Sequence, residues 1–285
     1  MIHAGALGFD ISHHQDVTES EMRAAKQNGY EFVIIRASHG MNEVDRKFAQ
    51  HYAAAKAAGL QVGVYAFYYY ADKDKSAQET VNFLRAIRNK HIDLPVFIDF
   101  ENRGEYAKGS HLGMLPKSVI TDRALAAIAE IKKAGYTAGI YADVDWLVNK
   151  MEMSRIPGDV IVWCADWHGE LSYFGPCHLR QYTSTGTVAG IGSGSVDMDR
   201  WLVDYPLATA VSTGAVGKIV NCVFWCNRRS GPSDKVKKVG IAKAGMDCFF
   251  NGKRVIAGVT WYHDSLGNWI HSKFVSIDDS KVPYM

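Results

Sequence analysis

Two carboxylic acids stand two residues apart near the end of an apolar run in the first half of the chain. The run PVFIDFE contains Asp99 and Glu101, and side chains two apart on a β-strand point to the same face, about 6–7 Å from each other. Asp10 ends another apolar run, LGFDIS, and Asp197 lies in a third, SVDMD. Crowded carboxyl groups raise one another's pKa. A carboxyl group that stays protonated can donate its proton to a leaving oxygen, so these four acids predict glycosidic bond cleavage.

A single acid after a buried strand is more often a helix cap or a turn residue than a catalytic group. Four acids on three strands, two of them in phase on one strand, favour the catalytic interpretation. Aromatic residues near the same strand ends would complete a sugar site, because sugar rings stack on aromatic faces while polar groups bind their hydroxyls. Each aromatic could equally be core packing. The predicted substrate-binding residues are Tyr65, Phe67, Tyr69, Tyr141, Trp163, Gln181 and Tyr182.

Metal chemistry has weaker support. His13 and His14 follow Asp10, but their spacing matches no common metal-binding motif. Five cysteines are too few for a disulfide scaffold, and Cys222 and Cys226 lack the second ligand pair that a zinc site needs. We expect no metal ion and no cofactor.

The elements that would position these residues alternate between strand and helix. Helical segments ending in Lys are followed by Gly29, Gly59 and Gly135, and each of these glycines can adopt the left-handed conformation that ends a helix. Strands that are apolar on both faces belong to a parallel sheet covered by helices. The pattern predicts an α/β fold, an irregular (β/α) barrel of about five βα units plus three strands, with active groups at the carboxyl ends of the strands. We expect strands at 7–12, 31–38, 61–70, 94–101, 137–143, 160–167, 178–183 and 195–201, and helices at 45–58, 75–88 and 118–134.

Charge divides the chain into two parts. Residues 1–207 carry 25 acidic and 21 basic residues, a net −4, whereas residues 208–285 carry 5 and 11, a net +6. The junction is a run of small uncharged residues typical of a linker. The positive second part suggests an anionic partner. We predict a catalytic barrel at 1–206, a linker at 207–216 and a small all-β barrel domain at 217–285.

Overall composition excludes several protein classes. The 285 residues are 47% hydrophobic and 22% charged, which is ordinary for globular proteins and not for disordered, collagenous or coiled-coil chains. No apolar run approaches the roughly 20 residues that span a bilayer, and no signal peptide follows Met1. We therefore expect no membrane insertion. Scattered basic residues without a recognisable motif argue against nucleic acid, and no assembly state follows from the sequence.

The first part of the chain resembles glycoside hydrolase family 25, the muramidases that include many phage endolysins. The resemblance implies cleavage of the β-1,4 bond between N-acetylmuramic acid and N-acetylglucosamine with net retention. It implies that Glu101 is the general acid/base and that Asp99 is its partner, as nucleophile or as stabiliser of a substrate-derived oxazolinium. Asp10 and Asp197 would orient the substrate and tune these two. The matching segments are GFDISHHQ, FVIIRAS, VGVYAFYY, PVFIDFE and QYTSTGTVAGIGSGSVDMD.

The tail resembles the bacterial Src-homology-3-type module that binds cell walls. The resemblance rests on residues 227–233, 261–263 and 267–274, and departs from the usual pattern at Cys222–Cys226 and Asn268. It implies peptidoglycan as a partner, and the net +6 charge of this part favours anionic wall polymers as a second one. The predicted wall-binding residues are Arg228, Arg229, Trp261, Tyr262 and Trp269.

Taken together, these features predict a phage endolysin that lyses a Gram-positive host and passes from the host cytoplasm to the wall through a holin. A bacterial autolysin of the same activity is an alternative. A metal-dependent polysaccharide deacetylase using Asp10 and the histidine pair is a weaker one. A non-catalytic wall-binding protein on a decayed barrel would not need the four acids.

Overall fold

The computed structural model describes residues 1–101, 112–192, 194–207, 215–264 and 268–282. The chain divides into two compact units. The barrel unit comprises Met1–Ile87, Ile92–Lys132 and Tyr136–Ala208, and the C-terminal unit comprises Arg88–His91, Lys133–Gly135 and Thr209–Met285. Most of the predicted linker, residues 208–214, lies outside the described residues. Within the described ranges, no helix has the length and hydropathy needed to cross a bilayer.

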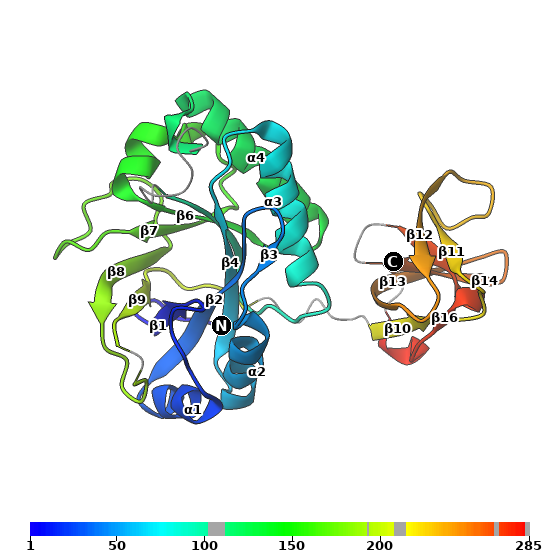
Figure 1. The fold of residues 1–285 in the computed structure, drawn as a ribbon, viewed down its shortest axis with the longest axis horizontal. Helices are drawn as coiled ribbons and strands as arrows, with labels where there is room; N and C mark the ends of the chain where they lie inside the picture. Colours follow the sequence, from blue (N-terminus) through cyan, green and yellow to red (C-terminus); the bar gives the residue numbers. More distant parts are fainter. Residues whose placement is uncertain (102–111, 193, 208–214, 265–267, 283–285) are drawn as a thin grey trace. The chain divides into compact units, whose positions relative to one another are not determined.

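Eight strands close into a barrel in the barrel unit (Figure 1). The order around it is β1, β2, β4, β5, β6, β7, β8 and β9, and β9 pairs with β1 again. Neighbours are parallel except for β9, which runs antiparallel to both β8 and β1. The mixed α/β fold with a closed barrel is therefore confirmed. The strands are β1 Leu7–Ile11, β2 Tyr30–His39, β4 Gln61–Tyr68, β5 Val96–Phe100, β6 Ala138–Asp143, β7 Ile161–Ala165, β8 Leu179–Gly186 and β9 Val196–Trp201, with a short β3 (Glu43–Val44) paired to β2.

Side-chain alternation along the strands builds two cores. In β2, Phe32 and Ile34 belong to the cluster inside the barrel, whereas Val33 and Ile35 belong to the cluster between strands and helices. Gly8 permits this packing, because a Cβ there would lie 2.3 Å from the Phe32 ring. Polar residues on the inward faces must therefore point into the barrel or to its open ends.

Helices lie outside the ring of strands (Figure 1). The first begins with a capping box in which Thr18 and Glu21 bond each other's backbone N–H groups. Gly29, Gly59 and Gly135 have φ angles of 91°, 76° and 89°, which confirms the predicted left-handed helix ends. The long helices are α1 Glu19–Gln27, α2 Phe48–Ala58, α3 Lys73–Ala86 and α4 Lys117–Lys133.

The barrel becomes irregular after β6, its fifth strand, one βα unit earlier than predicted. A π-helical turn, Trp146–Lys150, and a 3₁₀ turn, Met153–Arg155, replace a long fifth helix. Residues 166–178, between β7 and β8, contain no helix. A further 3₁₀ turn, Leu112–Met114, precedes α4.

The C-terminal unit is a seven-stranded antiparallel sheet with a core of its own. The strand order is β12-β11-β15-β14-β13-β10-β16. Buried Ile219, Phe250 and Ile270 lie at the centre of its core. The strands are β10 Ala215–Ile219, β11 Trp225–Arg229, β12 Lys238–Lys243, β13 Asp247–Ile256, β14 Val259–Asp264, β15 Trp269–His271 and β16 Val275–Ser276, with 3₁₀ turns at Ser272–Phe274 and Asp279–Lys281.

Candidate active site

A hollow of about 230 Å³ opens where the parallel barrel strands end. Its lining comes from the inward faces of seven strands and from the residue that follows β5. Barrel closure therefore gathers all four predicted acids and four of the predicted substrate-binding residues. The lining residues are Asp10, Asp99, Glu101, Asp197, Tyr65, Tyr141, Trp163 and Gln181.

The strand ladders set the positions of the four acids. Asp10 of β1 and Asp197 of β9 are direct cross-strand partners. Asp99 of β5 lies opposite Tyr141 of β6, and Glu101 follows it on the same side. One expectation needs correction, because Asp197 stands near the start of its strand rather than at the end. Since β9 is antiparallel, its first residues reach the edge where the parallel strands finish.

Gln181 of β8 connects several groups of the hollow. Its amide nitrogen Nε2 donates to Asp10 Oδ2 at 2.7 Å. Its oxygen Oε1 accepts hydrogen bonds from Tyr141 Oη and from Trp167 Nε1, both at 3.0 Å. Two donors facing one end of the amide define which end is the oxygen. Gln181 therefore holds Asp10 with a neutral donor and adds no charge to the site.

Asp10 is buried, with 3% of its surface exposed. Burial raises its pKa well above the ordinary value, and the charge of Asp197 raises it further. The hydrogen bond from Gln181 acts in the opposite direction but does not cancel these effects. Asp10 therefore keeps its proton to a higher pH than an ordinary aspartic acid does.

Two phenols face the same acids. Burial, followed by the charge of Asp10, raises the pKa of Tyr65. Burial, followed by the charge of Glu101, raises the pKa of Tyr141. Both hydroxyl groups therefore stay protonated: Tyr141 donates its hydrogen bond to Gln181, and Tyr65 can donate one to a ligand.

Residues 9–191 match the model of glycosyl hydrolases family 25. The chain belongs to this family. A curated relative, the autolytic lysozyme of Clostridium acetobutylicum, is 28% identical over 199 residues, which cover 68% of this chain and 55% of that protein. The chain thus spans about half the length of this relative.

Solved structures share the fold of the family 25 domain. A bacterial lysozyme from Streptomyces coelicolor matches with a TM-score of 0.57 and 23% identity over 70% of this chain and 92% of that one. The CTP1L endolysin matches with a TM-score of 0.56 and 24% identity over 69% of this chain and 66% of that one. These matches show that this part of the chain has the same fold as the two solved structures.

Three predicted substrate-binding residues of the family 25 domain lie outside the hollow's lining. Phe67 is buried and Tyr69 half-buried, with ring centroids 5.6 Å apart on the inward face of β4 and just beyond its end. Tyr182 points away from the hollow because its neighbour Gln181 points into it. Its ring instead lies 5.6 Å from the Arg200 guanidinium. Tyr182 is therefore a poor candidate for substrate contact.

Two residues outside the predicted substrate-binding set are connected to the site. Trp167 donates to Gln181, although just over half of its own surface is exposed. Asp199 is fully buried and accepts a hydrogen bond from Trp163 Nε1 at 2.8 Å. The rule that pairs Asp99 with Glu101 would have found Asp199, because it follows Asp197 by two residues on a strand.

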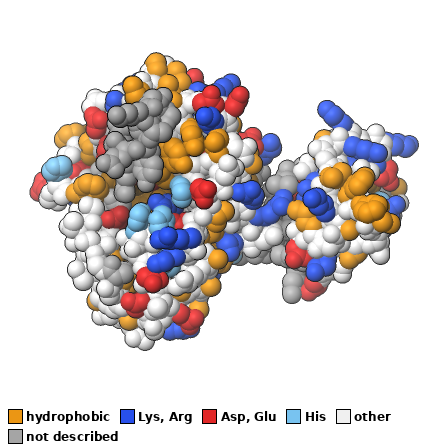
Figure 2. Space-filling model, in the orientation of Figure 1, with side chains coloured by type: hydrophobic (Ala, Val, Ile, Leu, Met, Phe, Trp, Pro, Cys, Tyr) orange, Lys and Arg blue, Asp and Glu red, His pale blue; other side chains and the backbone are white. Residues whose placement is uncertain are grey.

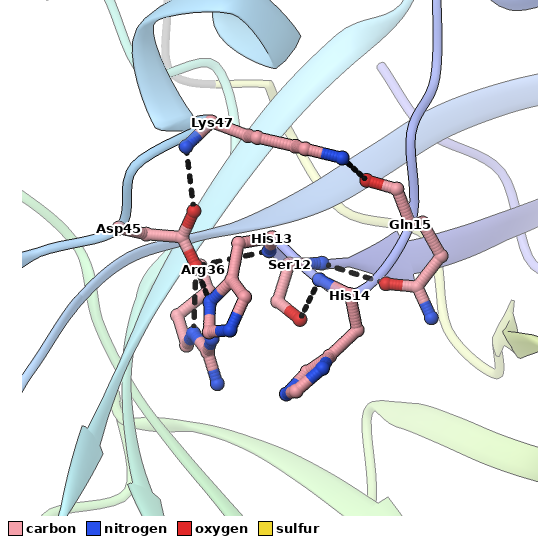
Figure 3. Close-up of polar contacts among 7 residues, drawn as sticks. All are labelled: Ser12, His13, His14, Gln15, Arg36, Asp45 and Lys47. Carbon is pink, nitrogen blue, oxygen red and sulfur yellow. Dashed lines mark hydrogen bonds and ion pairs between the residues drawn. The ribbon is translucent and has the colours of Figure 1, made fainter.

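The histidine pair belongs to a separate polar network (Figure 3). Asp45, which is buried, accepts hydrogen bonds from Arg36 Nε at 2.9 Å and from the backbone N–H groups of His13 and Lys47, both at 3.0 Å. The His13 ring contacts both Asp45 and Arg36. Burial alone would raise the pKa of Asp45, but these hydrogen bonds and the Arg36 charge lower it. The His13 ring therefore contacts the Arg36–Asp45 ion pair, whereas Asp10 is hydrogen-bonded to Gln181. His13 and Asp10 thus belong to different networks.

The predicted wall-binding residues of the C-terminal unit are largely internal. Arg228 is 8% exposed, and its Nε donates to Asp264 Oδ2 at 2.7 Å in a buried ion pair. Tyr262 donates to Asp279 Oδ1 at 2.7 Å. These groups hold the fold and are not available to a ligand. The buried members of the predicted set are Arg228, Trp261, Tyr262 and Trp269.

Arg229, the fifth predicted wall-binding residue, is half-buried. Its Nη1 donates to the backbone carbonyls of Asp234 at 2.7 Å and Val236 at 3.0 Å. This side chain therefore stabilises the segment between β11 and β12. The sequence pattern identified strand residues but not the face that each one uses.

Proposed function

We propose that this chain is a muramidase that cleaves the β-1,4 bond between N-acetylmuramic acid and N-acetylglucosamine with net retention. The observation that carries the proposal is the hollow that gathers four carboxylates in a family of glycosyl hydrolases. A relative described as an autolytic lysozyme supports peptidoglycan as the substrate.

The four acids have three roles in this proposal. Glu101 protonates the glycosidic oxygen as the bond breaks, and its conjugate base then activates water. As the glycosidic bond breaks, Asp99 attacks the anomeric carbon, or it stabilises the oxazolinium that the substrate's own N-acetyl group forms there. Water then displaces this new bond, and the two inversions give net retention. Asp10 and Asp197 orient the sugar, and the proton that Asp10 holds limits the negative charge of the hollow. Tyr141 bonds Gln181 and keeps its amide turned toward Asp10.

Product analysis of digested Gram-positive peptidoglycan tests the activity. New reducing ends on muramic acid are expected from the wild type and from Glu130→Gln, a control on an exposed face of α4. Glu101→Gln should lose at least 10³-fold in rate while still binding the wall. Free amines without reducing ends would indicate an amidase or peptidase and overturn the proposal. The anomeric configuration of the first-formed product, followed by NMR, tests retention.

The C-terminal unit, in the same proposal, is a small Src-homology-3-type barrel that binds anionic wall polymers. Two features support this role: the net charge of +6 on residues 208–285 and an exposed surface on this unit. The residues of this surface differ from the predicted wall-binding residues, which are largely buried. Phe224 and Trp225 are 69% and 55% exposed, and Ile241 is 48% exposed. Lys243 lies opposite Trp225 in the β11–β12 ladder. Figure 2 shows hydrophobic side chains beside Lys and Arg side chains on this unit.

Binding of the full-length Glu101→Gln variant to purified walls tests this second role. Binding should weaken as salt rises from 0.05 to 0.5 M, because salt screens charge contacts at a Debye length that falls from roughly 14 to 4 Å. It should also weaken on walls stripped of teichoic acid. Binding that is unchanged in both conditions would contradict the proposal.

We further propose that the protein is a phage endolysin that acts on Gram-positive hosts and reaches the wall from the cytoplasm through a holin. The shared fold with the CTP1L endolysin supports this origin. Expression inside a Gram-positive host should leave cells intact until a holin is expressed with it. Lysis without a holin would favour an autolysin with its own route of export.

A further inference from the structure

Asp199 lies beneath the hollow and none of its surface is exposed. On β9 it is the cross-strand partner of Gly8 on one side and Gln181 on the other. Its Oδ1 accepts a hydrogen bond from Trp163 Nε1 at 2.8 Å. The carboxyl group is therefore enclosed by three strands of the barrel.

The second oxygen of this carboxyl group differs from the first. Oδ2 is buried and makes no hydrogen bond to any of the described residues. The titratable side chains that interact electrostatically with the Asp199 carboxyl group are Asp10, Asp197 and Tyr182. An ionised carboxylate that is buried without a cation costs far more than a neutral carboxyl group.

The indole that Asp199 holds is central to the wall of the hollow. Trp163 is 1% exposed, and its ring centroid lies 4.5 Å from that of Tyr141 and 6.0 Å from that of Tyr65. It also packs on Phe97 at 5.1 Å. A rotation of the Trp163 indole would displace both tyrosines that face the catalytic acids.

We propose that Asp199 is a positioning residue whose carboxyl group stays neutral at working pH, so that it fixes the Trp163 indole without adding a negative charge beside Asp10 and Asp197. Burial raises the pKa of Asp199. The hydrogen bond from Trp163 acts in the opposite direction and the charge of Asp197 adds to the effect of burial, so the net shift is upward and agrees with this role. The catalytic consequence rests on the proposed function, whereas the protonation state does not.

Thermal unfolding of the full chain between pH 4 and pH 7 tests the protonation state. The unfolded chain ionises Asp199 above a pH of about 3.9, while the folded chain keeps it neutral, so the wild type loses stability as pH rises. Asp199→Asn cannot ionise in either state. The melting temperature of Asp199→Asn relative to wild type should therefore rise by about 3 °C per pH unit. Asp74→Asn, an exposed control on α3, should show no such trend.

Activity separates positioning from a simple structural role. Asn preserves an acceptor for Trp163, so Asp199→Asn should keep kcat/KM within about threefold and leave the pH–rate profile unmoved. Asp199→Leu removes the acceptor and should lose at least tenfold in kcat/KM, with altered Trp fluorescence.

A stability difference that is flat or falls with pH would show that Asp199 is ionised and would overturn the proposal. A shift of the pH–rate profile by more than half a unit in Asp199→Asn would overturn it as well. If the wild type had no muramidase activity, the proposed function would fail, and the thermal experiment would still decide the charge state of Asp199.

Discussion

The barrel unit and the C-terminal unit use polar side chains on strands in different ways. In the barrel unit, Asp10 and Gln181 point inward and reach a hollow that a ligand can enter. In the C-terminal unit, Arg228 and Asp264 are also buried, but they bind each other in an ion pair. Eight strands with long connections leave the end of the barrel open, whereas the small antiparallel sheet has room only for its core.

This difference teaches that an inward-facing polar residue has two possible roles. At an open strand end it is available for chemistry, and under a closed core it must have a partner to offset its burial. The contrast can be tested by removing buried polar groups from each unit.

The largest effect on stability is expected at the ion pair of the C-terminal unit. Arg228→Ala leaves the Asp264 carboxylate buried without its cation, so the free energy of unfolding of this unit should fall by about 3–5 kcal/mol. Denaturant unfolding of the full chain measures this loss. The double variant Arg228→Leu with Asp264→Asn removes both charges and should recover much of it. Equal losses in the single and double variants would mean that the charge of Asp264 is not the cause.

The second prediction concerns a buried acid of the barrel unit that is outside the hollow. Glu79 of α3 is 1% exposed, and burial raises its pKa to about 8, although the Tyr69 N–H donates to its Oε1 at 3.0 Å. A raised folded-state pKa gives stability that is complete below about pH 4.5 and is lost as pH rises through 8. Glu79→Gln should therefore stabilise the protein at pH 7 by on the order of 3 kcal/mol, since each pKa unit is about 1.4 kcal/mol.

Melting temperatures of Glu79→Gln and of Glu130→Gln across pH 4.5 to 8 check this prediction. The gain should grow with pH in the first variant and be absent in the exposed control. A gain of the same size at pH 4.5 would point to packing rather than ionisation.

Much of the barrel could be predicted because its signals are local. The helix ends at Gly29, Gly59 and Gly135 follow from the conformational freedom of glycine. Asp99 and Glu101 share a face because strand side chains alternate, and both line the hollow. These inferences require no knowledge of which strands are neighbours.

What could not be predicted depends on pairing over long distances. That Asp197 meets Asp10 follows from β9 running antiparallel to β1, and no local pattern specifies that direction. Gln181 reaches Asp10 only because β8 and β1 both pair with β9. In the C-terminal unit, Trp261 and Trp269 are predicted as wall-binding residues because tryptophan side chains often contact ligands. Both are instead buried, because a small unit also needs large apolar side chains in its interior.

A smaller effect is expected on the surface of the C-terminal unit. Trp225 is 55% exposed and Trp261 is 3% exposed, so they form a matched pair of tryptophans. Trp225→Ala should weaken wall binding about tenfold, roughly 1.4 kcal/mol, with little change in melting temperature. Trp261→Ala should instead destabilise the unit by about 3–5 kcal/mol, as loss of a buried aromatic does. Co-sedimentation with walls and thermal unfolding measure the two effects, and equal wall binding by Trp225→Ala and wild type would remove this surface from the proposal.

The smallest effect is expected from His51 of α2, a buried polar residue of the barrel unit that faces no ligand. None of its surface is exposed, and neither ring nitrogen has a hydrogen-bond partner among the described residues. Burial lowers the pKa of His51. The negative charge of Asp45 acts in the opposite direction, and the positive charge of Lys47 lowers the pKa further. A lowered folded-state pKa gives stability that is present above about pH 6.5 and is lost as pH falls through the folded value. The melting temperature of the wild type should therefore fall by a few degrees more than that of His51→Leu between pH 7 and pH 5. If the two fell in parallel, His51 would be taking up its proton without cost, and its site would be open to water despite its burial.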